Sequence, residues 1–162
     1  MNLPAGMAQP AWAPHLRSRA TLRTAPKRHF VDPSLAVAAL GAGPERLLAD
    51  LNLLGLLFES LVIRDLRVLT QPLDAAVLHY RDQYGVEADA VVQLPDGRWG
   101  AFEVKLGGRL VDEGAASLLR FRDTVDTSRS GEPGVLGVIA GTGFAYMRPD
   151  GIAVIPAGAL AP

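Results

Sequence analysis

Three residues near the middle of the chain have types and spacing suited to binding a metal ion: Asp89, Glu103 and Lys105. Magnesium typically takes one or two carboxylates and fills its other positions with water and substrate phosphate. With Asp89 and Glu103 as ligands, a Mg²⁺ or Mn²⁺ ion would polarise a phosphate and lower the pKa of a bound water. Lys105 would position that water or meet developing negative charge. These residues therefore predict a site for phosphodiester hydrolysis.

The turn Pro95-Asp96-Gly97 determines how these residues meet. A type I turn with a left-handed glycine suits a three-residue loop between antiparallel strands. Counting back from that loop, Asp89 falls opposite Glu103 and Glu87 opposite Lys105, and the strand period of two predicts that all four share one face. Opposed Cβ atoms lie about 5 Å apart, so the paired carboxylates repel unless a positive group lies between them.

A simpler interpretation makes Glu87 and Lys105 a cross-strand ion pair and leaves Asp89 and Glu103 solvated on an exposed sheet face. Such pairs are common and contribute little stability. The composition favours the metal site. The chain has fourteen arginines and only two lysines, so a lysine at position 105 is unusual for this sequence. Lysine is a compact point charge whose pKa shifts readily, which suits a position beside a metal.

Glu59 gives a second indication of a site. It lies in a helix expected from about Asn52 to Leu69, on a face with Leu56, Val62, Ile63 and Leu66, whereas the polar stripe of that helix passes through Ser60, Arg64 and Arg67. A carboxylate is expensive to bury there without a partner. Glu59 is therefore either an auxiliary acid at the metal site or the partner of an arginine elsewhere in the fold.

Three arginines are candidates for contact with nucleic acid: Arg109, Arg120 and Arg122. They precede or lie on the helix expected after the third strand, where they would either contact phosphates or form a solvated helix face. No P-loop of the form GxxxxGK[ST] occurs, so no ATPase activity is expected from this chain alone.

The elements expected around these residues follow the order α-β-β-β-α-β. After the long helix, extended segments are expected at 76–81, 86–94 and 98–106, then an amphipathic helix from Val111 to about Val125 and a buried strand at 135–140. Segments 144–147 and 152–155 predict a C-terminal hairpin at one edge. Earlier, a short strand is expected at 28–31, followed by a helix that Asp32 and Pro33 begin and another after Pro44.

Composition limits the class of protein. The chain of 162 residues, 49% hydrophobic, is long enough for one sizeable core. It has no cysteine and no apolar run near the roughly 20 residues of a membrane span, so a cytoplasmic location without membrane contact is expected. Residues 1–27 contain four prolines and no acidic residue, which favours a linker or the remnant of an upstream domain, with one α/β domain over 28–162.

Several sequence blocks resemble the family named domain of unknown function 4143 (DUF4143). The blocks are Arg28 to Leu35, Leu57 to Val62, and the stretch from Tyr80 through Glu87-Ala88-Asp89 to Phe102-Glu103-Val104-Lys105. The resemblance extends from about Pro10 onward. It implies the C-terminal part of a longer bacterial or archaeal protein whose N-terminal part is an AAA-type ATPase, and a separate ATPase of that type is therefore an expected partner.

The DUF4143 family is similar in turn to the restriction-endonuclease-like superfamily, whose site follows the pattern PD-(D/E)xK. This similarity implies a mixed central sheet flanked by helices, metal binding by Asp89 and Glu103, a catalytic role for Lys105 and support from Glu59. Glu87-Ala88 replaces the leading proline of the pattern. Two hypotheses follow: a Mg²⁺-dependent nuclease-like domain acting on DNA, or a non-catalytic module that docks an ATPase, a partner protein or nucleic acid.

Overall fold

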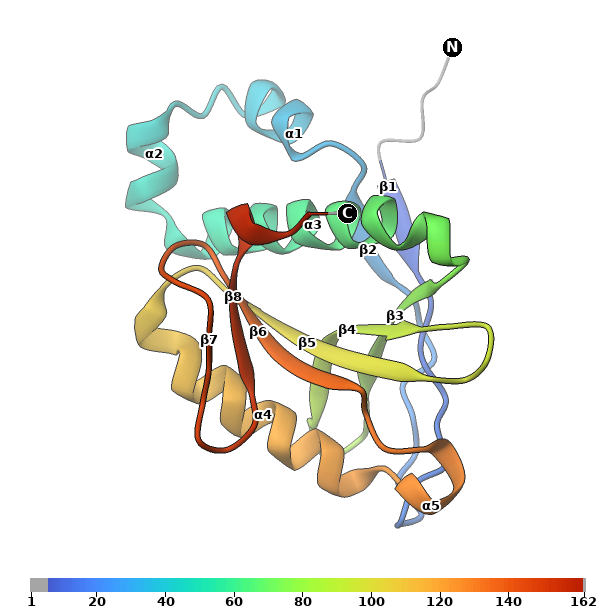
Figure 1. Ribbon diagram of the computed structural model, residues 1–162. Helices are drawn as coiled ribbons and strands as arrows, with labels where there is room; N and C mark the ends of the chain where they lie inside the picture. The colour runs from blue at the N-terminus through green and yellow to red at the C-terminus, as the bar shows by residue number, and fades with distance from the viewer. Residues whose placement is uncertain (1–5, 162) are drawn as a thin grey trace.

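A mixed six-stranded sheet forms the centre of the computed structural model, which describes residues 6–161 (Figure 1). Its strand order is β3-β4-β5-β6-β8-β7. The bounds are β3 Ala76–Arg81, β4 Glu87–Gln93, β5 Trp99–Lys105, β6 Val135–Ala140, β7 Tyr146–Met147 and β8 Ala153–Pro156. Strands β3, β4 and β5 are antiparallel, whereas β6 is parallel to both β5 and β8. The predicted α/β class with a mixed sheet is confirmed.

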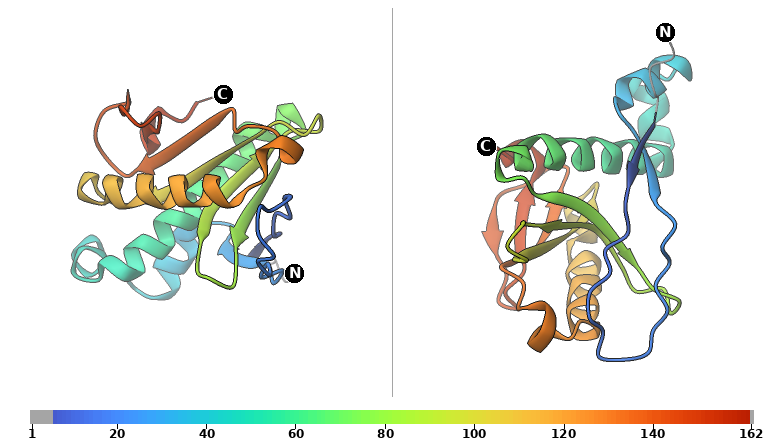
Figure 2. Two further views of the ribbon diagram at one scale, coloured as in Figure 1. Left: turned by 90° about the horizontal axis from the view of Figure 1, so that it is seen from below. Right: turned by 90° about the vertical axis from the view of Figure 1, so that its right-hand side faces the viewer.

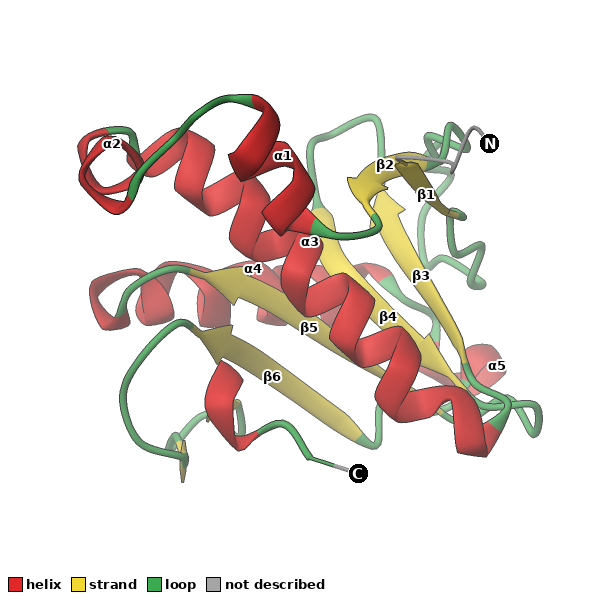
Figure 3. Cartoon of the chain, turned by 90° about the horizontal axis from the view of Figure 1, so that it is seen from above, coloured by secondary structure: helices red, strands yellow, loops and turns green. Residues whose placement is uncertain are grey.

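Two long helices cover the two faces of this sheet (Figure 3). Helix α3 (Leu51–Thr70) crosses one face, and α4 (Val111–Thr124) lies on the other and connects the parallel strands β5 and β6. A parallel pair requires such a crossover connection. The order α3-β3-β4-β5-α4-β6 is the predicted one. Strands β7 and β8 form the predicted antiparallel pair, and β8 also joins β6 in parallel.

The helices before α3 begin as the sequence predicts. Helix α1 (Pro33–Ala39) has Asp32 as its N-cap, whose carboxylate accepts a hydrogen bond of 2.9 Å from the backbone N–H of Ser34. Helix α2 (Pro44–Ala49) also starts with proline, and it contains no buried residue. Both helices project beyond α3, away from the sheet (Figure 2). The short α5 (Thr127–Ser130) follows α4.

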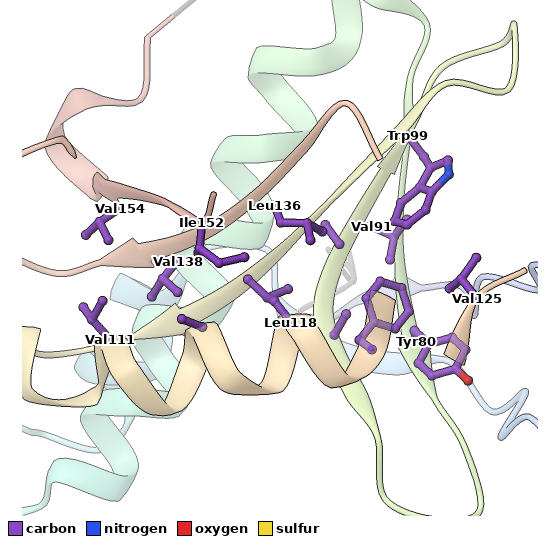
Figure 4. Close-up of a cluster of buried hydrophobic side chains, with 14 of the residues drawn as sticks. Tyr80, Val91, Trp99, Val111, Leu118, Val125, Leu136, Val138, Ile152 and Val154 are labelled. Atoms are coloured by element: carbon purple, nitrogen blue, oxygen red, sulfur yellow. The ribbon is translucent and has the colours of Figure 1, made fainter. Parts of the chain in front are cut away.

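Each face of the sheet has its own hydrophobic core. Between the sheet and α4, buried side chains of β3, β4, β5, β6 and β8 form one cluster with Leu118 and Phe121 of α4. Figure 4 shows Leu118 among the strand residues of this cluster. Between the sheet and α3, Val62, Ile63 and Leu66 pack on the opposite side of β4, β5 and β6. The two cores hold α3 and α4 at fixed positions across the strand ends. Within residues 6–161, no helix is long and apolar enough to cross a membrane.

The N-terminal residues form a two-stranded strap that packs on the edge of the sheet. The strap consists of β1 (Gly6–Gln9), β2 (Lys27–Phe30) and the loop between them, and it runs beside β3 (Figure 2). Trp12 N donates to the carbonyl of His79 at 2.7 Å, and the indole is 4% exposed in the core beside α4. Much of the stretch expected to be a linker is therefore packed on the domain, because Trp12 provides an apolar anchor.

We predict that Trp12→Ala destabilises the whole domain. The Trp12 ring lies 4.7 Å from that of Trp99 and 6.0 Å from that of Phe121, so truncation leaves a cavity and lowers the free energy of unfolding by about 3 kcal/mol or more. Urea unfolding followed by tryptophan fluorescence and circular dichroism measures this. Arg19→Ala, at an exposed position of the same loop, is the matched control and should change little. Similar unfolding free energies for the two variants would contradict this and show that Trp12 does not contribute to the stability of the domain.

Candidate functional site

The β4–β5 hairpin has the predicted register. Leu94 N donates to the carbonyl of Arg98 at 2.8 Å, and the pairing continues back to Ala90 opposite Phe102. Asp89 and Glu103 come next, just beyond this last backbone pair of the hairpin. The register counted from the turn residues is therefore confirmed.

A β-bulge in β4 changes the direction of Asp89. Opposite β3, Leu78 pairs with Val91 and Tyr80 pairs with Ala88, so one residue of β3 faces the two residues Asp89 and Ala90. Such a bulge re-aims side chains and interrupts the ladder. Beyond the bulge, a side chain replaces the backbone acceptor. Val104 N of β5 donates to Asp89 Oδ2 at 3.0 Å.

The bulge separates the contacts of the two predicted metal ligands. Asp89 Oδ1 lies 3.1 Å from Lys27 Nζ, on the side of α3. Glu103 instead contacts α4, where its Oε1 accepts from Ser117 Oγ at 3.3 Å, and its Oε2 lies 3.2 Å from Lys105 Nζ. The expectation that Glu87, Asp89, Glu103 and Lys105 all share one face is therefore wrong, because Asp89 and Glu103 turn to opposite sides. The cause is a pairing with β3 that the hairpin turn does not encode.

The simpler cross-strand interpretation is also wrong in its partners. Glu87 Oε1 lies 2.9 Å from Arg81 Nε on β3, and Lys105 pairs with Glu103 of its own strand instead. Lys105 Nζ lies 3.6 Å from a second carboxylate, that of Glu113 on α4. The side chain of Glu103 is only 5% exposed, so this carboxylate is buried and not solvated.

Glu59 belongs to the same cluster as Asp89. Lys27 Nζ lies 2.7 Å from Glu59 Oε1 and so bridges α3 and β4. The partner of Glu59 is thus a lysine from the strap. The alternative to a metal site that the sequence suggested was an arginine. The expected helix faces need a correction: Ser60 is buried and its Oγ accepts from Phe30 N, whereas Leu56 is 63% exposed.

Lys27 is the site residue that sequence reasoning missed. The chain contains only two lysines, and both contact carboxylates of this cluster. Lysine is equally unusual at both positions, so the argument from composition that favoured Lys105 also indicates Lys27. Its position in a proline-containing stretch favoured a linker, and nothing local in the sequence connects it with Asp89, 62 residues away.

A cavity of about 430 Å³ opens onto this cluster between α3 and the strand ends. Its charged groups are Glu59, Asp89 and Lys105, whereas Glu103 lies behind it against α4. Leu51, Leu56 and Leu110 contribute apolar surface. A Cβ at Gly55 would make only an ordinary contact, 3.6 Å from Leu106 Cδ1, so the spacing there does not require a glycine. The cavity is thus open, partly apolar and charged at its base.

Burial and mutual repulsion alter the acidity of the carboxylates. Burial, with the nearby charge of Asp89, raises the pKa of Glu103 to about 8 despite the attraction of Lys105. Burial and Asp89 also raise the pKa of Glu59, against the opposing effect of Lys27. Burial alone would lower the pKa of Lys27, but Asp89 and Glu59 outweigh it and raise that pKa above its ordinary value. The cluster therefore favours bound cations.

The oxygen donors of this cluster fit magnesium or manganese in kind. The charge of Asp89 acts on both of the other carboxylates and raises the pKa of Glu59 and of Glu103. One or two carboxylates with water satisfy Mg²⁺. However, both Asp89 oxygens already have partners, Lys27 and Val104 N. Within residues 6–161, no group of three or more His, Cys, Asp or Glu side chains is arranged to hold a metal.

The three candidate phosphate-binding arginines are not brought together. Arg109 is exposed in the 3₁₀ turn Gly108–Leu110, whose Leu110 lines the cavity. Arg120 and Arg122 lie further along α4, roughly 10 and 14 Å beyond Glu113 at 1.5 Å per residue. Arg120 is exposed, and Arg122 pairs with Asp123 at 3.0 Å. Of these three arginines, Arg109 is the one next in sequence to a residue that lines the cavity.

Comparison with known families identifies the chain. The family model described as domain of unknown function (DUF4143) matches residues 54–160 of the 162. The chain belongs to the DUF4143 family. The match includes Glu59, Asp89, Glu103 and Lys105, whereas the block from Arg28 to Leu35 lies outside it, as does Lys27. No curated protein and no solved structure matches this DUF4143 domain.

A buried histidine fixes the strap of this DUF4143 domain beside the cluster. Gln9 Nε2 donates to the carbonyls of Leu78 and Asp89, each at 2.9 Å, so the Gln9 Oε1 atom is left to accept from His29 Nε2 at 2.8 Å. Burial, with the charges of Lys27 and Arg67, lowers the pKa of His29 to about 4. The neutral ring is therefore part of the folded state.

We predict that His29→Gln makes the domain less sensitive to mild acid. Because the folded pKa of His29 is about 4 and the unfolded value is 6.5, the unfolded chain binds more protons between these values, and stability falls as pH drops from about 6.5 to 4. Glutamine can still donate to Gln9 but does not titrate. The loss of unfolding free energy between pH 7 and 4.5, measured in urea, should be smaller in the variant by about 1–2 kcal/mol. His15→Gln, at an exposed position, is the control; equal losses in wild type and His29→Gln would contradict the prediction.

Proposed function

We propose that this DUF4143 domain is a Mg²⁺- or Mn²⁺-dependent nuclease-like domain that hydrolyses phosphodiesters in DNA. The observation that carries the proposal is the cluster of Asp89, Glu103 and Lys105 at the end of the β4–β5 hairpin, next to an open cavity. The order α-β-β-β-α-β and the resemblance to PD-(D/E)xK enzymes support the same conclusion.

Asp89 and Glu103 would hold the metal, with Glu59 as a supporting carboxylate, once the Glu103 side chain turned from Ser117 on α4 towards the cavity that Asp89 and Glu59 line. When bound, the metal supplies polarisation of the phosphate and a water of lowered pKa. Lys105 is placed to stabilise negative charge, because its amine lies at the base of the cavity and is oriented by Glu103 at 3.2 Å and Glu113 at 3.6 Å. Arg109, which is exposed and precedes the cavity residue Leu110, would contact a neighbouring phosphate of the strand.

The leucine surface of the cavity contributes in a different way. Leu51, Leu56 and Leu110 form an apolar wall on one side of the charged base, and electrostatic attraction there would strengthen if a bound strand excluded water. The near-neutral charge of the chain, −1, argues against a broad basic DNA-binding surface. Binding is therefore expected to depend on the metal and on a few positive groups near the cavity.

A second candidate function is a non-catalytic docking module for an AAA-type ATPase, a partner protein or nucleic acid. The observation in its favour is the apolar exposure of the projecting helices. Leu35 and Leu40 around α1, and Leu48 and Leu51 around α2, are each at least 46% exposed. Size-exclusion chromatography with a neighbouring ATPase addresses this candidate, and a chain that stays monomeric and unbound would weaken it.

We predict that Lys105→Ala lowers DNA cleavage by roughly 10²–10³-fold, the usual effect of removing a group that stabilises transition-state charge. The measurement is cleavage of linear, supercoiled and branched DNA with Mg²⁺ or Mn²⁺. Asp89→Asn should abolish both cleavage and metal binding by calorimetry.

The matched control is Arg98→Ala, which removes a positive charge at the far end of the same hairpin, where Arg98 contacts only Asp96 among charged groups. It should cleave as wild type does. Circular dichroism and thermal unfolding verify that each variant is folded. Equal cleavage by wild type and Lys105→Ala, or none by either, would refute the nuclease proposal.

A further inference from the structure

Lys27 lies in the position that a cation must fill in this cluster. Its Nζ atom contacts Glu59 Oε1 at 2.7 Å and Asp89 Oδ1 at 3.1 Å, joining two carboxylates from different elements. The same Asp89 oxygen is the one left available by the hydrogen bond from Val104 N to Oδ2. A metal that binds Asp89 must therefore share an oxygen with the Lys27 amine or the Val104 N–H, or displace the amine from Oδ1; the repulsion between two cations on one oxygen favours displacement.

We propose that Lys27 is the built-in counter-ion of the site, and that its amine and a divalent cation exchange at Asp89. This inference rests on the proposed function for the metal and assigns a role to a residue outside the predicted motif. In the metal-free domain, Lys27 removes the repulsion between Glu59 and Asp89. When Mg²⁺ or Mn²⁺ binds, the amine leaves Asp89 and the ion takes over that neutralisation.

The strap allows this exchange without opening. Its backbone is held beside the bulge, since Gln9 Nε2 donates to the Asp89 carbonyl at 2.9 Å and His29 donates to Gln9. Trp12 fixes the following loop in the core. The Lys27 side chain, by contrast, is 29% exposed and has a flexible four-carbon stem. The amine can therefore swing from Asp89 towards solvent while β2 stays in place.

Lys27 and Lys105 have different roles in this arrangement. Lys105 contacts Glu103 and Glu113 on the side of α4 and has no direct contact with Asp89. Lys27 contacts Asp89 directly and lies on the side of α3. Exchange at Asp89 therefore displaces Lys27 and leaves Lys105 beside the ion, ready to face substrate. Only one of the two lysines competes with the metal.

Lys27→Gln tests the exchange directly, because the amide removes the charge and keeps a hydrogen-bond donor. Isothermal calorimetry with MnCl₂ and MgCl₂ alone, without DNA, should show binding at least tenfold tighter than in wild type. Lys27→Arg keeps the charge and should bind the metals no more tightly than wild type does. Arg28→Gln removes the neighbouring positive charge of β2, which is exposed, and should change affinity by less than threefold.

Thermal unfolding gives a second readout that does not depend on activity. Without metal, Lys27→Gln should melt below wild type, because Glu59 and Asp89 lose their shared cation. At a saturating concentration of Mn²⁺ the melting temperature should rise more in Lys27→Gln than in wild type, since ligand stabilisation grows with affinity. A purely structural role for Lys27 would lower stability equally with and without the ion.

Each outcome separates this inference from the proposed function. Equal or weaker metal binding by Lys27→Gln, with wild type binding and cleaving normally, overturns the exchange and leaves the nuclease function intact. Tighter binding in Lys27→Gln than in Arg28→Gln supports the exchange even if no DNA is cut. No metal binding by wild type or any Lys27 variant refutes both the exchange and the metal-dependent function.

Discussion

The constraint on which this structure depends is the neutralisation of carboxylates gathered in a poorly solvated place. Glu59, Asp89 and Glu103 come from α3, β4 and β5, and burial together with their mutual repulsion disfavours three negative charges. The two lysines of the chain lie among them. Isolated buried charges cost several kcal/mol each, so the cluster needs cations wherever it is ionised.

Much of the fold serves to bring these groups together. Helices α3 and α4 are held on opposite faces by separate cores, so Glu59 and Ser117 approach the strand ends from different sides. The bulge in β4 turns Asp89 towards the strap, and the strap delivers Lys27. The buried contacts of Trp12 and Gln9 keep the strap in register with the site.

The nuclease and docking hypotheses place different demands on the same cluster. In a metal-dependent enzyme, Lys27 is a stand-in that leaves, and Lys105 remains to face phosphate. In a docking module, the two lysines simply complete an internal ion-pair network, and the exposed leucines of α1 and α2 carry the interaction. The DUF4143 membership is common to both, and the preference of Asp89 for a metal over an amine distinguishes them.

The sequence by itself determined the local features: the caps of α1, the period of the strands, the Pro95-Asp96-Gly97 turn and hence the β4–β5 register. These depend on residues close together in the chain, whose preferences act without the rest of the fold. Only the tertiary structure decided where Asp89 points and that Lys27 meets it, because the bulge needs β3 and the contact spans 62 residues. Charges from distant segments meet only after packing places them, and no local pattern records that placement.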